Sequence, residues 1–410
     1  MATHREIGIY SYLSFSPGVG GKLKKEVDDF FVEEIPISIP ENENGRNLIL
    51  KVRLRNWETN RFVKLLSKKL GISRNRIRFA GTKDKRSVSV QYFCVLNFPQ
   101  EINAKLGGME ILSSFRTDYC LKLGDLLGNK FSIILKDAKC DSRIEKIEEE
   151  LNGKFPNFFG VQRFGASRPI SHIVGKMIVH GDFENAARYY IGYPGEFEDD
   201  PGRKVFFDTM DPRAAIKEIS QRAEYERAML NHLITHPGDF RGAFKALPRN
   251  LLMMFVHAYQ SYLFNMMVSE RLKIGTDIRI GDVVLKTDQY GRPIQEYVKV
   301  NDFNISKIKK LADAGKAYLS TLLLGYETEF SDGIQGEIER RIAEEEGVKK
   351  EMFRIREIPE ISSKGLRRPI IIRFMNYHRD GCNFRFTLFP GCYATSLMRE
   401  FMKQEELHWY

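Results

Sequence analysis

The sequence of 410 residues lacks the features that mark membrane, secreted and zinc-binding proteins. No apolar run reaches the roughly 18 residues of a membrane-spanning helix, so no membrane partner is expected. The N-terminus has neither the basic head nor the apolar core of a signal peptide, and a cytoplasmic location is predicted. The five cysteines are scattered, and no two lie two or three residues apart. This spacing contains no zinc motif and suits a reducing compartment.

Motifs for metals, nucleotides and redox cofactors are also missing. His232 and His236 lie four residues apart with no acid between them, so the pair is interpreted as part of a helix surface. The glycine-rich segment 18–23 has Leu23 where a phosphate-binding loop needs Ser or Thr, and no predicted strand leads into Gly-x-Gly-x-x-Gly. We therefore predict that the protein uses no metal and no cofactor, and that its chemistry depends on side chains alone.

Positive charge is in moderate excess, with 64 Lys and Arg residues against 54 Asp and Glu residues. The resulting net charge of +10 is compatible with nucleic-acid binding, and also with a charge that serves only solubility. The most basic segment of the first hundred residues leads directly into the most informative motif of the chain. Its members are Arg61, Lys64, Lys68, Lys69, Arg74 and Arg76.

Residues 78–91 place one carboxylate, Asp84, at the end of this basic segment. The flanking residues predict one strand that ends near Ala80 and another that starts at Val88, with a turn at Gly81. A carboxylate among cations stays ionised and is suited to catalysis, yet most charge runs are solvated surfaces. The local pattern is therefore compatible with either interpretation. The four cations around Asp84 are Arg78, Lys83, Lys85 and Arg86.

The rest of the chain mixes strand and helix patterns without a regular βαβ repeat, which favours an α+β fold. Strands are predicted at residues 30–35, 48–54, 77–80, 88–96, 369–374 and 384–389, and a hairpin at 121–136 around Gly124 and Gly128. Helices are predicted at residues 59–70, 142–151, 251–272, 334–346 and 393–404, the first with Thr59 as N-cap and Gly71 as its end. Pro194, Gly195, Pro201 and Gly202 are interpreted as breaks in the charged segment 184–221.

Five segments of the chain resemble, in order, the sequence blocks of the TruD family of pseudouridine synthases. Residues 80–91, Ala-Gly-Thr-Lys-Asp-Lys-Arg-Ser-Val-Ser-Val-Gln, are similar to the central block of the family. Residues 157–165, Asn-Phe-Phe-Gly-Val-Gln-Arg-Phe-Gly, are similar to a second block, and segments 29–34, 124–131 and 390–400 to three more. Cys392 departs from the Ser that is more usual in the last block. Five ordered blocks over nearly the whole chain are far more specific than any single motif.

This resemblance implies a fold, a domain organisation and a reaction. The fold is a pseudouridine-synthase catalytic domain with a mixed sheet, interrupted by a large inserted α+β domain. The catalytic domain is expected at residues 1–180 with a return segment at 365–410, and the inserted domain at 181–364. The reaction breaks the N1–C1′ bond of a uridine, turns the base and joins C5 to C1′. It oxidises nothing and releases no group, so no cofactor is required.

The resemblance also implies that Asp84 is the catalytic carboxylate. It can act as a nucleophile at C1′ or on the base, or it can remove a sugar proton, and all three routes remain open. Lys83 and Lys85 are expected to keep Asp84 charged and to bind the flanking phosphates. By similarity, Lys24 is expected near the active site, although an ordinary surface position beside Lys22 fits its local sequence equally well.

The target uridine has to leave the RNA stack, which requires an aromatic or apolar platform for the base. By similarity, Phe159 is that platform, whereas Phe158 is interpreted as a core residue. Asn157 is expected to hold the catalytic loop or the base by hydrogen bonds. Arg86 and Gln162 complete the predicted substrate-binding set.

Family membership implies a tRNA uridine as the substrate, with position 13 as the usual target, and implies no protein partner. The alternatives are a different tRNA or RNA site and a non-catalytic RNA-binding role. A methyltransferase would need a methyl-donor pocket, and no glycine-rich strand-loop signature in the sequence supports one.

Overall fold

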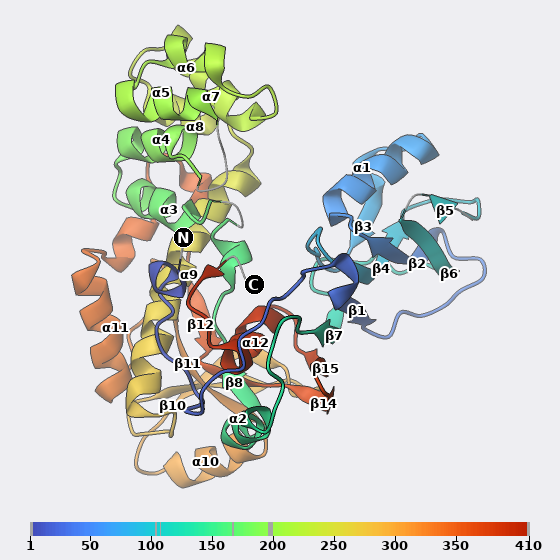
Figure 1. Cartoon of the computed structure of the whole chain (residues 1–410), viewed down its shortest axis with the longest axis vertical. Coiled ribbons are helices and arrows are strands. Elements are labelled where there is room, and N and C mark those ends of the chain that lie inside the picture. Colours follow the sequence, from blue (N-terminus) through green and yellow to red (C-terminus); the bar gives the residue numbers. More distant parts are fainter. Residues whose placement is uncertain (1–2, 103–104, 107, 166–167, 196–199, 408–410) are drawn as a thin grey trace. The chain divides into compact units, whose positions relative to one another are not determined.

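The computed structural model describes residues 3–102, 105–106, 108–165, 168–195 and 200–407 (Figure 1). The described chain forms two compact units. The sheet unit comprises residues 14–155 and 373–404, and the helical unit comprises residues 3–13, 156–372 and 405–407. The chain passes from the sheet unit into the helical unit between residues 155 and 156, and it returns to the sheet unit between residues 372 and 373. Asp84 therefore belongs to the sheet unit, whereas Asn157 and Phe159 belong to the helical unit.

The sheet unit is organised by a mixed sheet of nine described strands in the order β14-β15-β7-β1-β4-β2-β6-β5, with β3 paired to β4. The strands are β1 Phe30–Pro36, β2 Asn47–Arg55, β3 Ile77–Phe79, β4 Val88–Val95, β5 Lys105–Leu106, β6 Met109–Thr117, β7 Leu126–Ile134, β14 Met375–Asp380 and β15 Asn383–Leu388. β1 and β4 run parallel, and the other described pairs of this sheet are antiparallel. The mixed α+β fold expected from the sequence is confirmed.

Helix α1, Thr59–Leu70, covers part of this sheet with its apolar side. Phe62 and Leu66 are buried against Leu50, Val52 and Phe93 of the strands. Gly71 ends the helix in the left-handed conformation, at φ 64°, as predicted.

The predicted N-cap of α1 is wrong. The side chain of Glu58 caps the helix by accepting a hydrogen bond from the Asn60 amide. Thr59 is fully buried, and its hydroxyl bonds to Lys83 and Gln91, so it is not available to the helix terminus.

The hairpin predicted around Gly124 and Gly128 is also wrong, because residues 126–134 form one continuous strand, β7. Gly128 lies inside that strand opposite Ile35 of β1. A Cβ atom at Gly128 would come within 2.7 Å of the Leu388 carbonyl oxygen of β15. This glycine therefore permits a close approach between strands and does not mark a turn.

The remaining helices of the sheet unit are α2, Arg143–Leu151, and α12, Ala394–Met402. A disulfide joins Cys140, which precedes α2, to Cys382, which lies between β14 and β15. The scattered cysteines were expected to suit a reducing compartment, yet two of them are paired in the structure. The two residues are 242 positions apart, and only the folded sheet brings their Cα atoms within 5.6 Å.

The helical unit is built around α9, Arg249–Ile274, which spans 26 residues and buries residues along its whole length. Figure 1 shows a group of helices near one end of α9, and a four-stranded sheet with α10 near the other. The helices are α3 Ser171–Val179, α4 Phe183–Gly192, α5 Pro201–Thr209, α6 Pro212–Glu218, α7 Glu224–Thr235, α8 Phe240–Lys245, α10 Ile305–Asp313 and α11 Gly333–Glu345. The sheet has the order β10-β9-β11-β12, with bounds Pro293–Lys299, Val283–Thr287, Ala317–Leu323 and Leu366–Pro369.

Two short strands carry the chain from one unit to the other. These are β8, Lys154–Pro156, and β13, Ile371–Arg373. Among the helices that the structure describes, none is long and apolar enough to cross a membrane.

Candidate active site

Asp84 lies in the loop between β3 and β4, and this loop is held at several points. The Gly124 amide donates to the Ala80 carbonyl at 2.8 Å, and the Lys83 amide donates to the Thr59 hydroxyl at 2.9 Å. The Ser87 hydroxyl donates to the carbonyl of Asp84 itself at 2.9 Å. The backbone on both sides of the carboxylate is therefore fixed by hydrogen bonds.

The same network includes two buried polar residues of the 80–91 segment, Ser89 and Gln91. Thr59 donates its hydroxyl to Gln91 at 3.0 Å, and Gln91 donates to Ser89 at 2.8 Å. All three side chains are buried. Gln91, the last residue of the 80–91 segment, thus supports the loop from the middle of the sheet.

Lys24 supplies the cation that pairs with Asp84. Its Nζ lies 2.9 Å from Asp84 Oδ2. The side chain of Lys24 is only 8 % exposed, whereas that of Asp84 is 48 % exposed. The carboxylate is thus presented to the outside, while its partner is held in place by the protein.

The parallel pairing of β1 and β4 explains why Lys24 and Asp84 meet. Phe31 of β1 is aligned with Val88 of β4, so the two strands start at the same edge of the sheet. Lys24 precedes β1 and Asp84 precedes β4, and both segments therefore lie at that edge. The sequence predicted both strands but not that they are parallel neighbours.

Lys83 has a different partner from the one expected. Its Nζ donates to Glu34 Oε1 at 2.5 Å, and Glu34 Oε2 accepts the Tyr92 amide at 2.9 Å. Burial raises the pKa of the Glu34 carboxyl, while Lys83 and the Tyr92 amide act in the opposite direction. Lys83 was expected to keep Asp84 charged, and in the structure its ammonium group pairs directly with the buried Glu34 of β1 instead.

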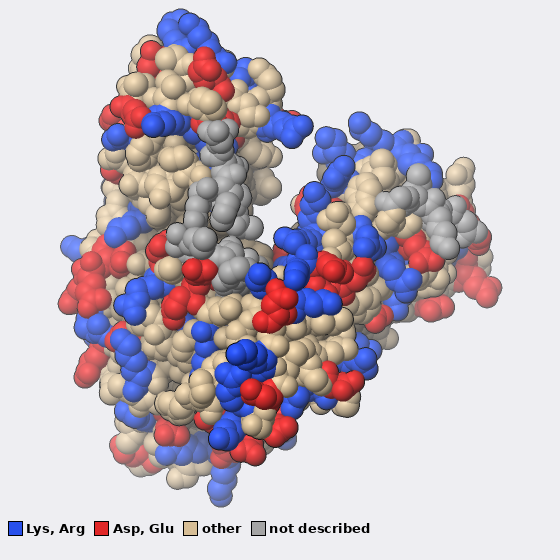
Figure 2. Space-filling view, viewed as in Figure 1, with Lys and Arg blue, Asp and Glu red and all other residues tan. Residues whose placement is uncertain are grey.

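Lys85 and Arg86 are exposed in the same loop as Asp84. Arg86 donates from its guanidinium to the Lys25 carbonyl at 2.8 Å. The lysines and arginines of α1 are exposed as well, and Figure 2 shows a gathering of basic side chains over this part of the sheet unit. Arg61, Lys64, Lys68 and Lys69 are the α1 residues of this surface, which we call the α1 basic surface.

Asn157 is held inside the helical unit. Its Nδ2 donates to the Pro369 carbonyl at 3.2 Å, and its Oδ1 accepts from Arg368 at 2.7 Å. The Arg368 guanidinium also bonds to the carbonyl of Asn157. Since both ends of the amide are engaged and the residue is 2 % exposed, Asn157 fixes the segment that leads to Phe159.

Phe159 is held from its backbone and along its ring. Its amide donates to Asn265 Oδ1 at 2.9 Å, and its carbonyl accepts from the same side chain at 3.2 Å. The Arg368 guanidinium carbon lies 4.2 Å from the ring centroid, and Phe264 meets the ring edge-on at 5.5 Å. Phe158 is 1 % exposed, as expected for a core residue, but Phe159 is itself only 4 % exposed.

Gln162 carries a further signal. Its Oε1 is buried and accepts no hydrogen bond from any residue that the structure describes. A buried polar atom of this kind usually has a water or ligand partner. Gln162 follows Phe159 by three residues in the same segment.

Sequence reasoning missed Arg368 and Asn265. Asn265 stands in the apolar pattern of the helix predicted at residues 251–272. The polar side chain of Asn265 on a buried helix was the available signal, because a fully buried amide requires a hydrogen-bond partner.

Comparison with known proteins settles the family. The family model described as tRNA pseudouridine synthase D (TruD) matches residues 6–401. The chain belongs to the TruD family. It is accordingly a tRNA pseudouridine synthase, an isomerase. The matched region contains Asp84 in one unit and Phe159 in the other.

Individual TruD relatives cover the chain almost completely. A protein of Methanococcoides burtonii named probable tRNA pseudouridine synthase D is 39 % identical over 98 % of this chain and 98 % of its own. A Picrophilus torridus protein of the same name is 39 % identical over 97 % of each chain. The crystal structure of the putative TruD from Methanosarcina mazei aligns with a TM-score of 0.83 at 36 % identity, over 99 % of this chain and 98 % of that one. The expected TruD fold is thereby confirmed.

Proposed function

We propose that this TruD enzyme converts one specific uridine of tRNA, at position 13, into pseudouridine, with Asp84 as the catalytic carboxylate. The observation that carries the assignment is the pairing of a half-exposed Asp84 with a buried Lys24 on a loop held by hydrogen bonds. Within the described residues, Lys24 is the cation that pairs with this carboxylate. One carboxylate oxygen is thereby positioned, and the other remains for the substrate.

The chemistry requires little more than such a carboxylate. The N1–C1′ bond breaks, the uracil turns while it stays bound, C5 bonds to C1′, and the proton on C5 is transferred to solvent or to a base while N1 gains one. Product and substrate have the same composition, so no oxidant or group donor enters the balance. Asp84 acts as the nucleophile at C1′, as the nucleophile on the base, or as the base that removes a sugar proton.

Phe159 is the proposed platform for the flipped uracil, and the guanidinium of Arg368 stacks with it. A planar guanidinium over an aromatic ring extends the surface on which a base can stack. Asn157 acts as a positioning residue, because its amide is engaged by Arg368 and Pro369. Gln162 is the proposed hydrogen-bonding partner of the RNA in this segment, since its Oε1 lacks a described donor.

Lys85, Arg86 and the α1 basic surface are the proposed contacts for the tRNA backbone. Phosphate contacts from exposed Lys and Arg supply affinity without reading sequence. The alternative is a different tRNA or RNA target for the same chemistry.

The experiment that tests the function compares the wild type with Asp84→Asn on a tRNA transcript, with pseudouridines mapped at single-nucleotide resolution. We expect the wild type to modify position 13 and the variant to form no product, with its melting temperature unchanged. A transcript with cytidine at position 13 should stay unmodified. Product at another position would retain the enzyme class and change the target, and substantial turnover by Asp84→Asn would refute the role of Asp84.

A further inference from the structure

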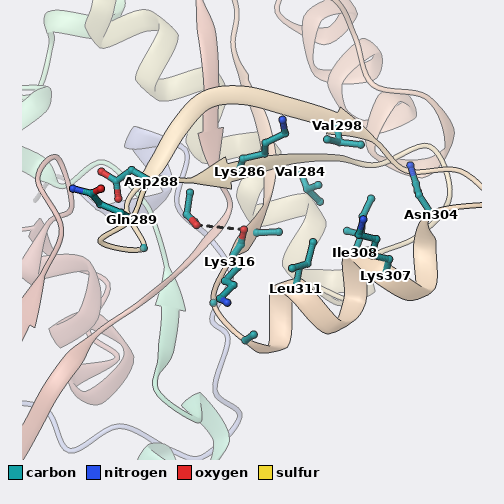
Figure 3. Close-up of a pocket in the computed structure, with 15 residues that line it drawn as sticks. Val284, Lys286, Asp288, Gln289, Val298, Asn304, Lys307, Ile308, Leu311 and Lys316 are labelled. Atoms are coloured by element: carbon teal, nitrogen blue, oxygen red, sulfur yellow. Dashed lines mark hydrogen bonds between the residues drawn. The ribbon is translucent and has the colours of Figure 1, made fainter.

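A groove in the helical unit has no place in the proposed reaction. It has a volume of about 820 Å³ and lies between the β9–β10 hairpin, helix α10 and the start of β11 (Figure 3). All of its lining residues belong to the helical unit, so Asp84 is not part of it.

The inside of this groove is apolar, and its ends are polar. Val284, Ile308 and Leu311 supply apolar side chains from β9 and α10. Figure 3 shows Gln289 at the hairpin end of the groove and Asn304 at the opposite end, beside the start of α10. Apolar walls with a few amide groups are the usual construction of a site for a planar organic group such as a nucleobase.

Lysines give the same groove a positive rim. Lys286, Lys307 and Lys316 are exposed and belong to its lining. Within the described residues, neither Lys307 nor Lys316 forms an ion pair, and Lys286 has only the exposed partner Glu296 at 3.2 Å. Exposed pairs of this kind contribute little, so Lys286 remains able to bind an anion. The segment 283–317 as a whole has seven Lys or Arg residues and four Asp or Glu residues.

Exposed aromatic residues stand beside the lining. Tyr290, between two residues of the groove, is 53 % exposed, and Phe303, next to Asn304, is 99 % exposed. A phenylalanine that is almost fully exposed contributes nothing to a core. Aromatic rings among lysines are the combination with which proteins bind unpaired nucleotides, since the rings stack on bases and the lysines bind phosphates.

We propose that this groove binds one unstacked nucleotide of the tRNA, with its base against the apolar walls and its phosphate on Lys307 and Lys316. The proposal rests on the proposed function, which supplies RNA as the polyanion. The single-stranded loops and ends of a tRNA offer unstacked bases of the required kind. The helical unit then contributes an RNA site that is separate from the α1 basic surface and from Asp84.

The test compares tRNA affinities of charge-matched double variants of helix α10 and its C-terminal turn. Lys307→Gln with Lys316→Gln removes two rim charges, whereas Lys309→Gln with Lys310→Gln removes two exposed charges of α10 that do not line the groove. Dissociation constants are measured between 50 and 200 mM salt. We expect the rim pair to lower the slope of log affinity against log salt by about one, because one phosphate contact is lost, and the control pair to leave it within measurement error.

A second variant, Ala314→Trp, obstructs the exposed mouth of the groove without changing its charge. It should weaken tRNA binding roughly tenfold, as the loss of one stacked base predicts, and leave the salt slope unchanged. The proposal would be overturned if the rim and control double variants lost equal tRNA affinity, or if Ala314→Trp bound tRNA as tightly as the wild type does. Rim-dependent binding of free uridine monophosphate with unchanged tRNA affinity would also overturn it, in favour of a free-nucleotide site. If the wild type forms no pseudouridine, the proposed function fails instead.

Discussion

Lys24 donates a hydrogen bond from Nζ to Oδ2 of Asp84 at 2.9 Å, across 60 positions of sequence. Lys24 has a left-handed backbone conformation, at φ 53°, which is uncommon for a residue other than glycine. Its ammonium group also lies 4.5 Å from the centroid of the Phe30 ring. A strained backbone, a buried stem and an aromatic neighbour together hold the lysine in one position before substrate arrives.

Replacing Lys24 should therefore impair the reaction more than RNA binding. We expect Lys24→Met to lower the single-turnover rate on the order of a hundredfold, because a misplaced catalytic group loses about that much. The affinity for tRNA should change less than threefold, roughly the effect of one phosphate contact at most.

Lys25 offers a matched control for this experiment, since its amine pairs with Asp137 on the surface of the same unit. Lys25→Met should leave the single-turnover rate close to that of the wild type. If both methionine variants lose rate equally, local charge and not the Lys24–Asp84 contact determines catalysis.

Replacing each of the two neighbouring phenylalanines by leucine should distinguish their roles. Alanine is a poor probe, because both rings are buried and each truncation would cost roughly 3–5 kcal/mol of stability. Leucine retains most of the apolar volume and removes the flat face. We expect Phe159→Leu to lower the single-turnover rate by about ten- to a hundredfold, which corresponds to one stacked base.

Phe158→Leu serves as the control and should retain turnover. Its melting temperature should fall slightly, by about as much as that of Phe159→Leu. Single-turnover rates and melting curves of the two variants decide the assignment. A large rate loss in Phe158→Leu alone would show that the two aromatic roles are reversed.

Much of the sheet unit was predictable, because apolar and polar residues alternate along its strands. The boundaries of β1, β2 and β4 agree with the pattern to within one or two residues. The pairing partners were not predictable, because alternation marks a strand without naming its neighbour. The contacts of Lys24 with Asp84 and of Lys83 with Glu34 follow from the positions of β1 and β4, so the sequence left both open.

The helical unit contains helices where breaks were predicted. Pro201, one of the predicted breaks, is the first residue of helix α5 and does not interrupt a helix, and Pro212 begins α6 in the same way. Proline suits that position, because it lacks only an amide that would have no partner in the helix. Asp200 and Asp211 cap the two helices through their side chains. The Asp-Pro pairs were the available signal, and treating proline only as a breaker missed it.

Binding of tRNA should weaken steeply with salt. If roughly six phosphates are neutralised, affinity falls about a thousandfold between 50 and 200 mM salt. Lys64→Gln with Lys68→Gln, on the α1 basic surface, should reduce the salt slope by about two. The exposed Lys146 of α2 provides a control, since Lys146→Gln removes a helix charge of the same unit outside that surface. An affinity that is flat across the salt range would exclude a phosphate-based interface.

His172 should make the helical unit sensitive to acid. The residue is 6 % exposed on α3, where its ring stacks on Tyr262 at 5.0 Å and meets Phe164 edge-on at 5.3 Å. Burial lowers the pKa of His172 to about 4 from an ordinary value of 6.5. Below pH 6.5 this histidine is protonated in the unfolded chain, whereas in the folded chain it is protonated only below about pH 4. The contribution of neutral His172 to the unfolding free energy is therefore complete at neutral pH and is lost as the pH falls.

Between pH 7 and pH 5 this difference amounts to about 2 kcal/mol of unfolding free energy. His172→Phe keeps an aromatic ring in the same place and removes the titration, so it should abolish that part of the pH dependence. Hydrogen exchange of the α3 and α9 amides, measured at both pH values, reports the helical unit alone. His378→Gln removes an exposed histidine of the sheet unit and should leave those amides unaffected. If His172→Phe retains the full acid dependence, other buried groups of the helical unit are responsible, and His257, whose pKa burial also lowers, is the next to replace.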